Sequence, residues 1–251
     1  MEKIAIITGG SRGLGRNTAV SLARRGTGSI ITYRSNRAEA DAAVAEIQAL
    51  GARAVALQLD TGDSAGFPAF AAEVARVLQA TWGRDRFDYL VNNAGHGAGG
   101  LIAEMSEEIF DSLYRVHFKG VFFLTQKLLP LIADGGRIVN LSSGLARFAM
   151  PGYAAYASMK GAIEVFSRYL AKEAGARGIA VNAVAPGAIE TDFGGGHVRD
   201  DAGLNKLVAS NTAMGRAGVP DDIGPMIAAL LGDENRWLTA QRIEVSGGMF
   251  V

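Results

Sequence analysis

The sequence predicts an α/β fold in which one sheet of about seven parallel strands is covered by helices on both faces. Short strand-like runs alternate with longer segments of helical spacing along the whole chain, which implies parallel strands joined by right-handed crossovers. Several of the strand-like runs are almost entirely apolar, as expected when both faces of a sheet are covered. No linker or change of composition interrupts the alternation, so residues 1–251 are expected to form a single domain.

The strands are expected where runs rich in β-branched and apolar residues occur, at 3–8, 29–33, 53–59, 87–93, 136–142, 179–185 and 242–246. Helical spacing predicts helices between them, at roughly 14–26, 36–50, 66–80, 104–131, 152–175 and 220–232. The segment at about 192–215 contains three adjacent glycines, Gly194 to Gly196. Because such glycines permit hinging, this segment is expected to be mobile and to form a loop at the substrate.

The composition excludes several classes of function. Hydrophobic residues make up 49% of the 251 residues, and 25 basic residues balance 25 acidic ones, which gives no electrostatic reason to expect a nucleic-acid or membrane partner. The chain has no cysteine, so disulfides, thiolate catalysis and zinc–thiolate sites are excluded. The apolar start of the chain is too short for a signal sequence, and no run approaches the ~18 apolar residues of a membrane span. A cytoplasmic location is therefore expected.

A glycine-rich turn follows the first predicted strand. Residues 8–15 read TGGSRGLG and open a helical pattern, which is the context that a phosphate-binding turn requires. Glycine lets the backbone approach a pyrophosphate closely, and the helix amino terminus offers free N–H groups and a positive dipole. The spacing here is Gly9-x-x-x-Gly13-x-Gly15, which differs from G-x-G-x-x-G. A plain strand–helix turn is the alternative interpretation of this motif alone.

The stretch YAAYASMK, residues 153–160, holds two tyrosines and one lysine. On a helix, residues four apart share a face, so Tyr156 lies beside Lys160, whereas Tyr153 has Ala157 at that offset. A free tyrosine has a pKa near ~10, and a lysine cation within ~4–6 Å lowers it toward the range useful for a general acid or base. The alternative is an exposed pair of side chains on a helix surface.

Taken in order over roughly 180 residues, these and four further motifs resemble those of the short-chain dehydrogenase/reductase family, in particular bacterial 3-oxoacyl-carrier-protein reductases. The resemblance implies one Rossmann-like, doubly wound NAD(P)-binding domain. The motifs that carry it are Thr8-Gly9-x-x-x-Gly13-x-Gly15, Asp60, Asn92-Asn93-Ala94-Gly95, Ser143, Tyr156-x-x-x-Lys160 and Pro186-Gly187.

The resemblance also implies roles for individual residues. Tyr156 is the expected catalytic acid/base, and Lys160 is its partner and a ligand of the nicotinamide ribose. Ser143 ends a predicted strand, where open α/β sheets place their ligands, and its hydroxyl can donate to a substrate carbonyl. Ser142 is the competitor, but the family's 13-residue spacing to the tyrosine favours Ser143. His117 stands where the family has an asparagine of a proton relay; it is expected to take part in that relay, and the alternative is a packed histidine.

The cofactor is expected to be NADP(H) rather than NAD(H). NAD enzymes commonly carry an acidic residue at the end of the second strand, but residues 32–37 contain neither Asp nor Glu. Arg34 and Arg37 lie there instead, and Arg12 lies in the glycine turn, where arginine can hold a 2′-phosphate. The implied cofactor contacts are Gly9, Ser11, Arg12, Gly13, Leu14, Gly15, Arg34, Asp60, Asn92, Ala94, Gly95, Tyr156, Lys160, Pro186, Gly187, Ile189 and Thr191.

The function expected from these residues is NADP(H)-dependent hydride transfer to or from a carbonyl/alcohol pair, with 3-oxoacyl thioesters among the candidate substrates. The alternatives are a non-catalytic NADP(H)-binding regulator and an isomerising or dehydrating enzyme on the same fold. A homotetramer or homodimer is implied, paired through 104–131, 152–175 and the last strand. No metal ligand set is expected, because His96 and His197 lack metal-ligand spacing. Candidate substrate-lining residues are His96, Leu145, Arg147, Phe148, Met150, Phe193 and Met214.

Overall fold

The structure is a computed structural model that describes residues 2–251. All seven strands are parallel and form one sheet in the order β3-β2-β1-β4-β5-β6-β7, which confirms the predicted fold class. Strands β2 and β3 lie on one side of the β1–β4 pair, and strands β5 to β7 lie on the other. The strand order therefore reverses between β1 and β4, and ligands of such sheets bind at this switch point. The strands are β1 Ile4–Ile7, β2 Gly28–Tyr33, β3 Ala54–Gln58, β4 Phe87–Asn92, β5 Ile132–Leu141, β6 Ala180–Pro186 and β7 Arg242–Val245.

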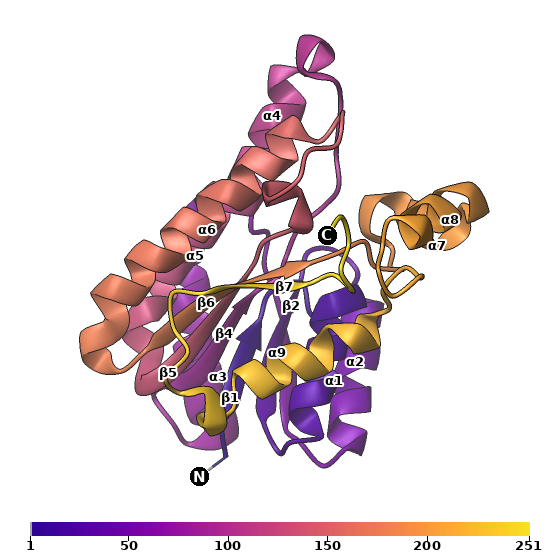
Figure 1. Cartoon of the computed structure of the whole chain (residues 1–251). Helices are drawn as coiled ribbons and strands as arrows, with labels where there is room; N and C mark the ends of the chain where they lie inside the picture. Colours follow the sequence, from indigo (N-terminus) through magenta and orange to yellow (C-terminus); the bar gives the residue numbers. More distant parts are fainter. Residues whose placement is uncertain (1) are drawn as a thin grey trace.

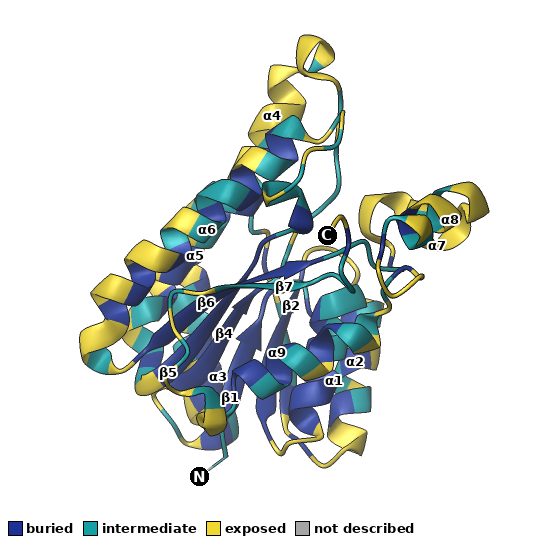
Figure 2. Cartoon of the chain, in the orientation of Figure 1, coloured by how far each residue is buried: buried dark blue, intermediate teal, exposed yellow. Residues whose placement is uncertain are grey.

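Helices cover both faces of the sheet, as Figure 1 shows, with α1, α2 and α9 on one face and α3, α5 and α6 on the other. Each face has its own apolar cluster, and the central strands are buried throughout (Figure 2). In the part of the chain that the structure describes, no helix is long and apolar enough to cross a membrane. The helices are α1 Gly13–Ala23, α2 Arg37–Ala49, α3 Phe67–Trp82, α4 Glu107–Tyr114, α5 Gly120–Leu128, α6 Ala154–Ala174, α7 His197–Asp200, α8 Ala202–Ser210 and α9 Gly224–Leu230.

Two segments differ from the prediction. The helix expected at 104–131 is interrupted by a π turn, Arg115–Lys119, where the N–H of Gly120 bonds the carbonyl of Arg115. The segment 192–215 is not simply a loop, because it contains α7 and α8. The Asp201 side chain caps α8 by accepting hydrogen bonds from two backbone N–H groups of its first turn. The mobility expected of this segment stays a prediction.

The carboxyl ends of the strands bring the functional motifs together. The glycine turn follows β1, Asn92 ends β4, Ser142 and Ser143 follow β5, and Pro186 ends β6. Because parallel strands end at the same edge of a sheet, motifs far apart in the chain meet there. Helix α6 then carries Tyr156 and Lys160 in its first two turns toward that edge.

Candidate active site

The glycine turn has a backbone that requires glycine. Gly9 and Gly13 have φ values of +64° and +53°, in the left-handed region where a side chain is strained. A Cβ on Gly15 would collide with the carbonyl oxygen of Gly9 and would lie 2.6 Å from the Asn93 side-chain nitrogen. The unusual spacing of these glycines therefore follows from the tight turn.

Thr8 and Asn93 hold this turn, although their motifs predicted no role for either side chain. The Thr8 hydroxyl accepts hydrogen bonds from the N–H groups of Asn93 and Ala94, both at 2.9 Å. The Asn93 side chain donates to the carbonyls of Thr8 at 2.8 Å and Gly9 at 3.1 Å. The two residues tie the end of β1 to the end of β4. Their signal was present in the quoted motifs, in the threonine before Gly9 and the second asparagine after β4.

The amino terminus of α1 fits an anionic phosphate. Its first turn contains no acidic residue, and no side chain among residues 2–251 caps it, so its N–H groups are free to bind an anion. Arg12 is 63% exposed and its guanidinium lies 3.8 Å from Asp192; Arg34 is 74% exposed and lies 3.8 Å from Asp60. Such exposed, long ion pairs are weak, so both guanidinium groups are free to hold a further phosphate.

Arg37 differs from these two arginines. It donates to the Asp41 carboxylate at 3.1 Å, and a hydrogen bond with Tyr33, followed by that with Asp41, raises the pKa of its guanidinium. Of the two arginines after β2, Arg34 is therefore the one whose side chain is less engaged.

The other expected cofactor residues lie around the same edge. Asn92 is buried, and its side chain donates to Thr125 at 3.0 Å and to Asn140 at 2.8 Å, so it braces β4 against β5 and α5. The Asp60 carboxylate accepts from the N–H of Gly62 at 2.8 Å. The remaining expected contacts lie in the glycine turn, at the start of α1, after β4, or at and after the end of β6, namely Ser11, Leu14, Ala94, Gly95, Pro186, Gly187, Ile189 and Thr191.

Tyr156, Lys160 and Ser143 converge. Tyr156 is 8% exposed and its phenol is hydrogen-bonded to the Ser143 side chain. The Lys160 ammonium lies 5.6 Å from the centre of the tyrosine ring and donates to the carbonyl of Leu141 at 2.7 Å. Tyr153, by contrast, is 43% exposed. The structure thus distinguishes the two tyrosines as the helical spacing predicts.

Ser142 and Ser143 face different partners. The Ser142 hydroxyl donates to the Glu164 carboxylate at 2.6 Å, whereas the Ser143 hydroxyl lies beside Tyr156 and accepts from the N–H of Leu145 at 3.2 Å. The structure therefore places Ser143, and not its competitor, next to the phenol.

Burial dominates the electrostatics of this cluster. It raises the pKa of the Tyr156 phenol above its ordinary value, and the hydrogen bond from Ser143 offsets only part of the shift. It lowers the pKa of the Lys160 ammonium to about 7, because a buried cation loses its hydration. Burial therefore sets the direction of the shift at Tyr156, and a lowering of its pKa by Lys160 stays a prediction.

His117 lies in the π turn and is 1% exposed. Its Nε2 lies 2.8 Å from the carbonyl oxygen of His96 and so carries the proton, because a carbonyl can only accept. Nδ1 is buried and has no partner among residues 2–251. The ring meets Tyr156 edge-on at 5.1 Å. Burial and then the charge of Lys160 lower its pKa to about 2, so His117 stays neutral instead of titrating near ~6.5 as a free histidine does.

Tyr156 packs in an apolar cluster with Leu113 and Met159, and an aromatic ring lies beside it. The rings of Tyr156 and Phe193 are 6.0 Å apart, and Phe148 packs on Phe250 at 4.6 Å. Arg147, a candidate substrate-lining residue, donates to Glu244 at 2.7 and 2.8 Å and to the carbonyls of Met249 and Phe250. Within residues 2–251, no group of three or more His, Asp or Glu side chains is placed to hold a metal ion.

Comparison with known proteins relates this site to ketone reduction. A family model described as enoyl-(acyl carrier protein) reductase matches residues 9–250. The promiscuous reductase LugOII, which catalyses keto-reduction at C1 during lugdunomycin biosynthesis, is 38% identical with a TM-score of 0.94, over 99% of this chain and 98% of that one. The 3-oxoacyl-[acyl-carrier-protein] reductase FabG of Staphylococcus aureus is 35% identical over 100% of this chain and 99% of its own.

A third relative was solved with its cofactor. The angucycline C-6 ketoreductase LanV with bound NADP is 32% identical, with a TM-score of 0.94 over 99% of this chain and 95% of that one. A structure of the landomycin C-6 ketoreductase LanV with NADP and rabelomycin is 33% identical, with a TM-score of 0.89 over 99% and 96%.

Proposed function

Since this chain belongs to the short-chain dehydrogenase/reductase family of oxidoreductases, we propose that it is an NADPH-dependent reductase of ketones on fused-ring aromatic skeletons. The observation that carries the reaction type is the convergence of Ser143, Tyr156 and Lys160 at the sheet edge that holds the glycine turn. This convergence favours an enzyme over a non-catalytic regulator, because a regulator needs no buried, hydrogen-bonded phenol.

The bound nicotinamide supplies the hydride. The hydroxyls of Ser143 and Tyr156 hold the carbonyl oxygen, where negative charge develops as the hydride arrives. Tyr156 gives its proton to that oxygen; its raised pKa keeps the phenol protonated at any working pH, as an acid for reduction must be. Lys160, buried behind the ring, returns a proton to the phenol and binds the cofactor ribose.

His117 takes part in this return path as a hydrogen-bond acceptor. The neutral ring cannot carry the proton as an imidazolium, since its pKa is about 2. Its buried Nδ1 lone pair is available to hold a water or the Lys160 ammonium in place. The position of the ring against Tyr156 supports this role.

The preference for NADPH over NADH is attributed to Arg12 and Arg34. Both guanidinium groups are exposed and weakly paired, and the stretch that follows β2 offers no carboxylate before Glu39. A ribose 2′-phosphate would complete the coordination of both arginines. The cofactor in the LanV structure supports the assignment.

The substrate class rests on Phe193 and on the relatives. The ring of Phe193 lies 6.0 Å from that of Tyr156 and is 47% exposed, so it offers a flat apolar face suited to a fused ring system, and LanV was solved with rabelomycin. Because Arg147 is fully engaged by Glu244 and two carbonyls, it is not free for an anionic substrate. A 3-oxoacyl thioester, the type of substrate named for FabG, is the second candidate.

Assembly into a homotetramer, or a homodimer, is part of the proposal. Exposed aromatic side chains gather on α5 and α6, where Phe122 and Tyr169 line a shallow apolar groove with Phe118 and Val165. Apolar patches of this kind mark protein contacts. Light scattering of the purified protein tests it, and a monomer would contradict it. A cytoplasmic location stays a prediction.

The test is oxidation of NADPH by the purified protein with 2-tetralone and with an acetoacetyl thioester, each repeated with NADH. We expect turnover with NADPH, at least tenfold higher kcat/KM for the fused-ring ketone, and little turnover with NADH. A higher kcat/KM for the thioester would overturn the proposed substrate class, but it would leave the proposed reductase activity standing. No cofactor oxidation with either compound, in a protein that binds NADPH, would contradict the proposed reaction.

A further inference from the structure

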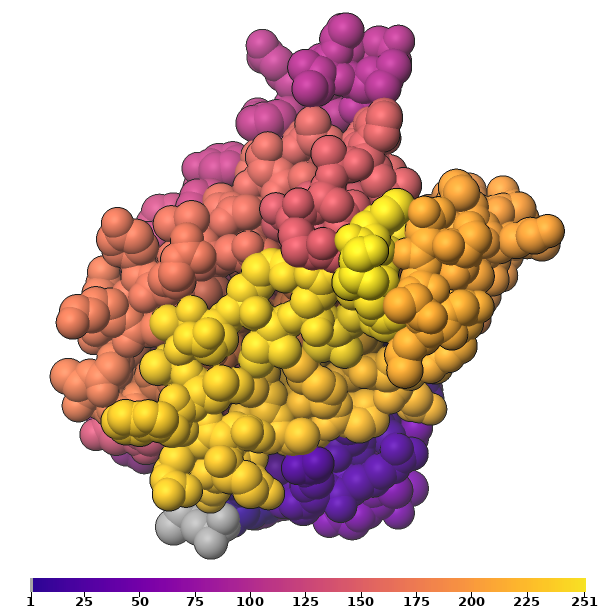
Figure 3. Space-filling view, viewed as in Figure 1, coloured from indigo at the N-terminus to yellow at the C-terminus, as the bar shows by residue number. Residues whose placement is uncertain are grey.

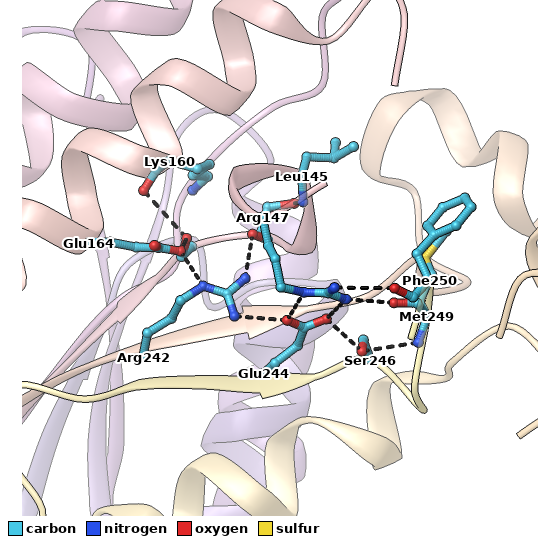
Figure 4. Close-up of polar contacts among 11 residues, drawn as sticks. Leu145, Arg147, Lys160, Glu164, Arg242, Glu244, Ser246, Met249 and Phe250 are labelled. Carbon is cyan, nitrogen blue, oxygen red and sulfur yellow. Dashed lines mark hydrogen bonds and ion pairs between the residues drawn. The ribbon is translucent and has the colours of Figure 1, made fainter. Parts of the chain in front are cut away.

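A ladder of ion pairs runs from α6 to the C-terminal residues (Figure 4). Arg242 donates to Glu164 at 2.7 Å on one side and to Glu244 at 2.8 Å on the other. Arg147 then donates to Glu244 through two nitrogens, at 2.7 and 2.8 Å. The hydrogen bond from Arg147 is the largest cause that lowers the pKa of Glu244, to about 2, so Glu244 stays negatively charged between the two arginines over the working range of pH.

The inner end of this ladder touches the backbone of the active site. Arg242 donates to the carbonyl oxygen of Ser143 at 3.3 Å. Glu164 accepts from the Ser142 hydroxyl at 2.6 Å, and that hydroxyl also lies 3.4 Å from the carbonyl of Lys160. The ladder therefore contacts both segments that carry the proposed catalytic side chains, the turn after β5 and helix α6.

The outer end of the ladder holds the C-terminal segment, residues 246–250. Arg147 donates to the carbonyls of Met249 at 2.7 Å and Phe250 at 3.2 Å. The same segment bonds the end of the α7–α8 region, since the N–H of Phe250 donates to Asn211 and the N–H of Met214 donates to Gly247. In Figure 3 the last residues, in yellow, lie against the orange surface of that region.

The side chain of Arg242 joins helix α6, strand β7 and the turn that carries Ser143. The guanidinium of Arg242 makes three contacts in three directions, to α6, to the Ser143 backbone and along β7. A planar fork of donors can do this, whereas the point charge of lysine cannot. The Ser143 carbonyl also accepts from the N–H of Ala146 at 3.1 Å, but that bond lies within the turn itself, whereas Arg242 ties the same carbonyl to α6 and β7.

We propose that Arg242 is a positioning residue for the reaction, which fixes the turn that carries Ser143 relative to Tyr156 and Lys160. It touches neither substrate nor cofactor in this role; it acts through the Ser143 backbone. The inference rests on the proposed function, because it concerns the geometry in which Ser143 and Tyr156 hold the carbonyl oxygen. Small displacements of such groups cost on the order of 10²-fold in rate.

The experiment compares Arg242→Ala and Arg242→Lys with Arg236→Ala. Arg236 is an exposed arginine near the same end of the chain, and among residues 2–251 its side chain bonds only the carbonyl of Asp233. We expect Arg242→Ala to lower kcat for 2-tetralone by about 10²-fold, with the Kd for NADPH changed less than threefold. Added guanidinium ion is expected to restore part of the rate. Arg242→Lys, which keeps the charge and the fold, is expected to lose about tenfold in kcat. Arg236→Ala is expected to match the wild type.

Three results bear on the inference. If both Arg242 variants keep kcat within twofold of the wild type while Tm falls, the ladder only stabilises the fold and the inference is wrong. If the loss appears in the Kd for NADPH instead of kcat, Arg242 serves the cofactor site and the inference is also wrong. A wild-type protein that binds NADPH but reduces no ketone would overturn the proposed function first, and that result is recognised before any variant is made.

Discussion

Two groups of ionisable side chains lie at the same edge of the sheet, and they differ in almost every physical property. Arg12 and Arg34, beside the glycine turn, are exposed and only loosely paired. Tyr156, Lys160 and His117 are buried, and burial is the largest cause of every pKa shift among them. Exposed arginines keep their charge at any pH and suit recognition of phosphate. Buried groups have a costly charge and therefore suit proton transfer.

The strongest test of this contrast removes the acid from the buried cluster. We expect Tyr156→Phe to lower kcat by about 10³-fold, because the proton donor is lost while the ring still packs. Tyr153→Phe is the matched control, since that phenol is exposed, and it is expected to stay within twofold of the wild type. Steady-state NADPH oxidation measures both. Equal losses of kcat in the two variants would contradict the assignment of the proton donor to Tyr156 and not to Tyr153.

The pH profile tests whether Lys160 supplies the proton. Its pKa is lowered to about 7, so its cation is present below that pH and is lost as pH rises. We expect the rate of ketone reduction to fall up to about tenfold per unit above pH 7. Lys160→Arg keeps the charge at all pH values, so its profile should be flat even if its rate is lower. A wild-type rate that does not change between pH 6 and 9 would contradict this role.

The exposed group is tested by cofactor choice. We expect Arg34→Ala to raise the KM for NADPH by about tenfold, the loss of one charge-assisted hydrogen bond, and to leave the KM for NADH unchanged. Arg37→Ala is the control, because Arg37 is held by Asp41 and Tyr33. If the two variants behave alike, or if NADH is affected equally, the 2′-phosphate does not bind at Arg34.

The buried ring of His117 makes the free energy of unfolding depend on pH. Its folded pKa of about 2 lies below that of a free histidine, so between these values the unfolded chain binds the proton and the folded one does not. Stability is therefore lost as pH falls below ~6.5. Relative to pH 7, the loss at pH 5 amounts to about 2 kcal/mol from this residue. Urea unfolding at pH 7 and pH 5 measures this loss, and in His117→Asn the free energy of unfolding should fall between the two pH values by about 2 kcal/mol less than in the wild type. If it falls by the same amount in both proteins, His117 is not a buried neutral ring.

The smallest expected effect concerns Ala240, which belongs to neither group of ionisable side chains. Ala240 has a φ of +60°, a left-handed conformation that strains any residue with a Cβ. We expect Ala240→Gly to raise the free energy of unfolding by about 1 kcal/mol without changing kcat. Ala45→Gly, on the exposed face of α2, should lower it by about the same amount. If both variants changed the free energy of unfolding in the same direction, backbone strain at Ala240 would be contradicted.

Much of this protein follows from local sequence. The alternation of apolar strands and helical segments predicted a parallel sheet, and the four-residue offset paired Tyr156 with Lys160. The glycine spacing predicted a tight turn, which the positive φ values of Gly9 and Gly13 explain. Each of these depends on residues that are neighbours in the chain, where backbone geometry restricts the outcome.

Tertiary structure decided what depends on partners far away in the chain. The direction of Ser142 was set by Glu164, and the role of Arg147 by Glu244, 97 residues away. The low pKa of the His117 ring comes from its burial and from the charge of Lys160, 43 residues away in the chain. A sequence shows which groups can ionise, but their pKa values depend on how much water folding removes, and only the assembled core determines that.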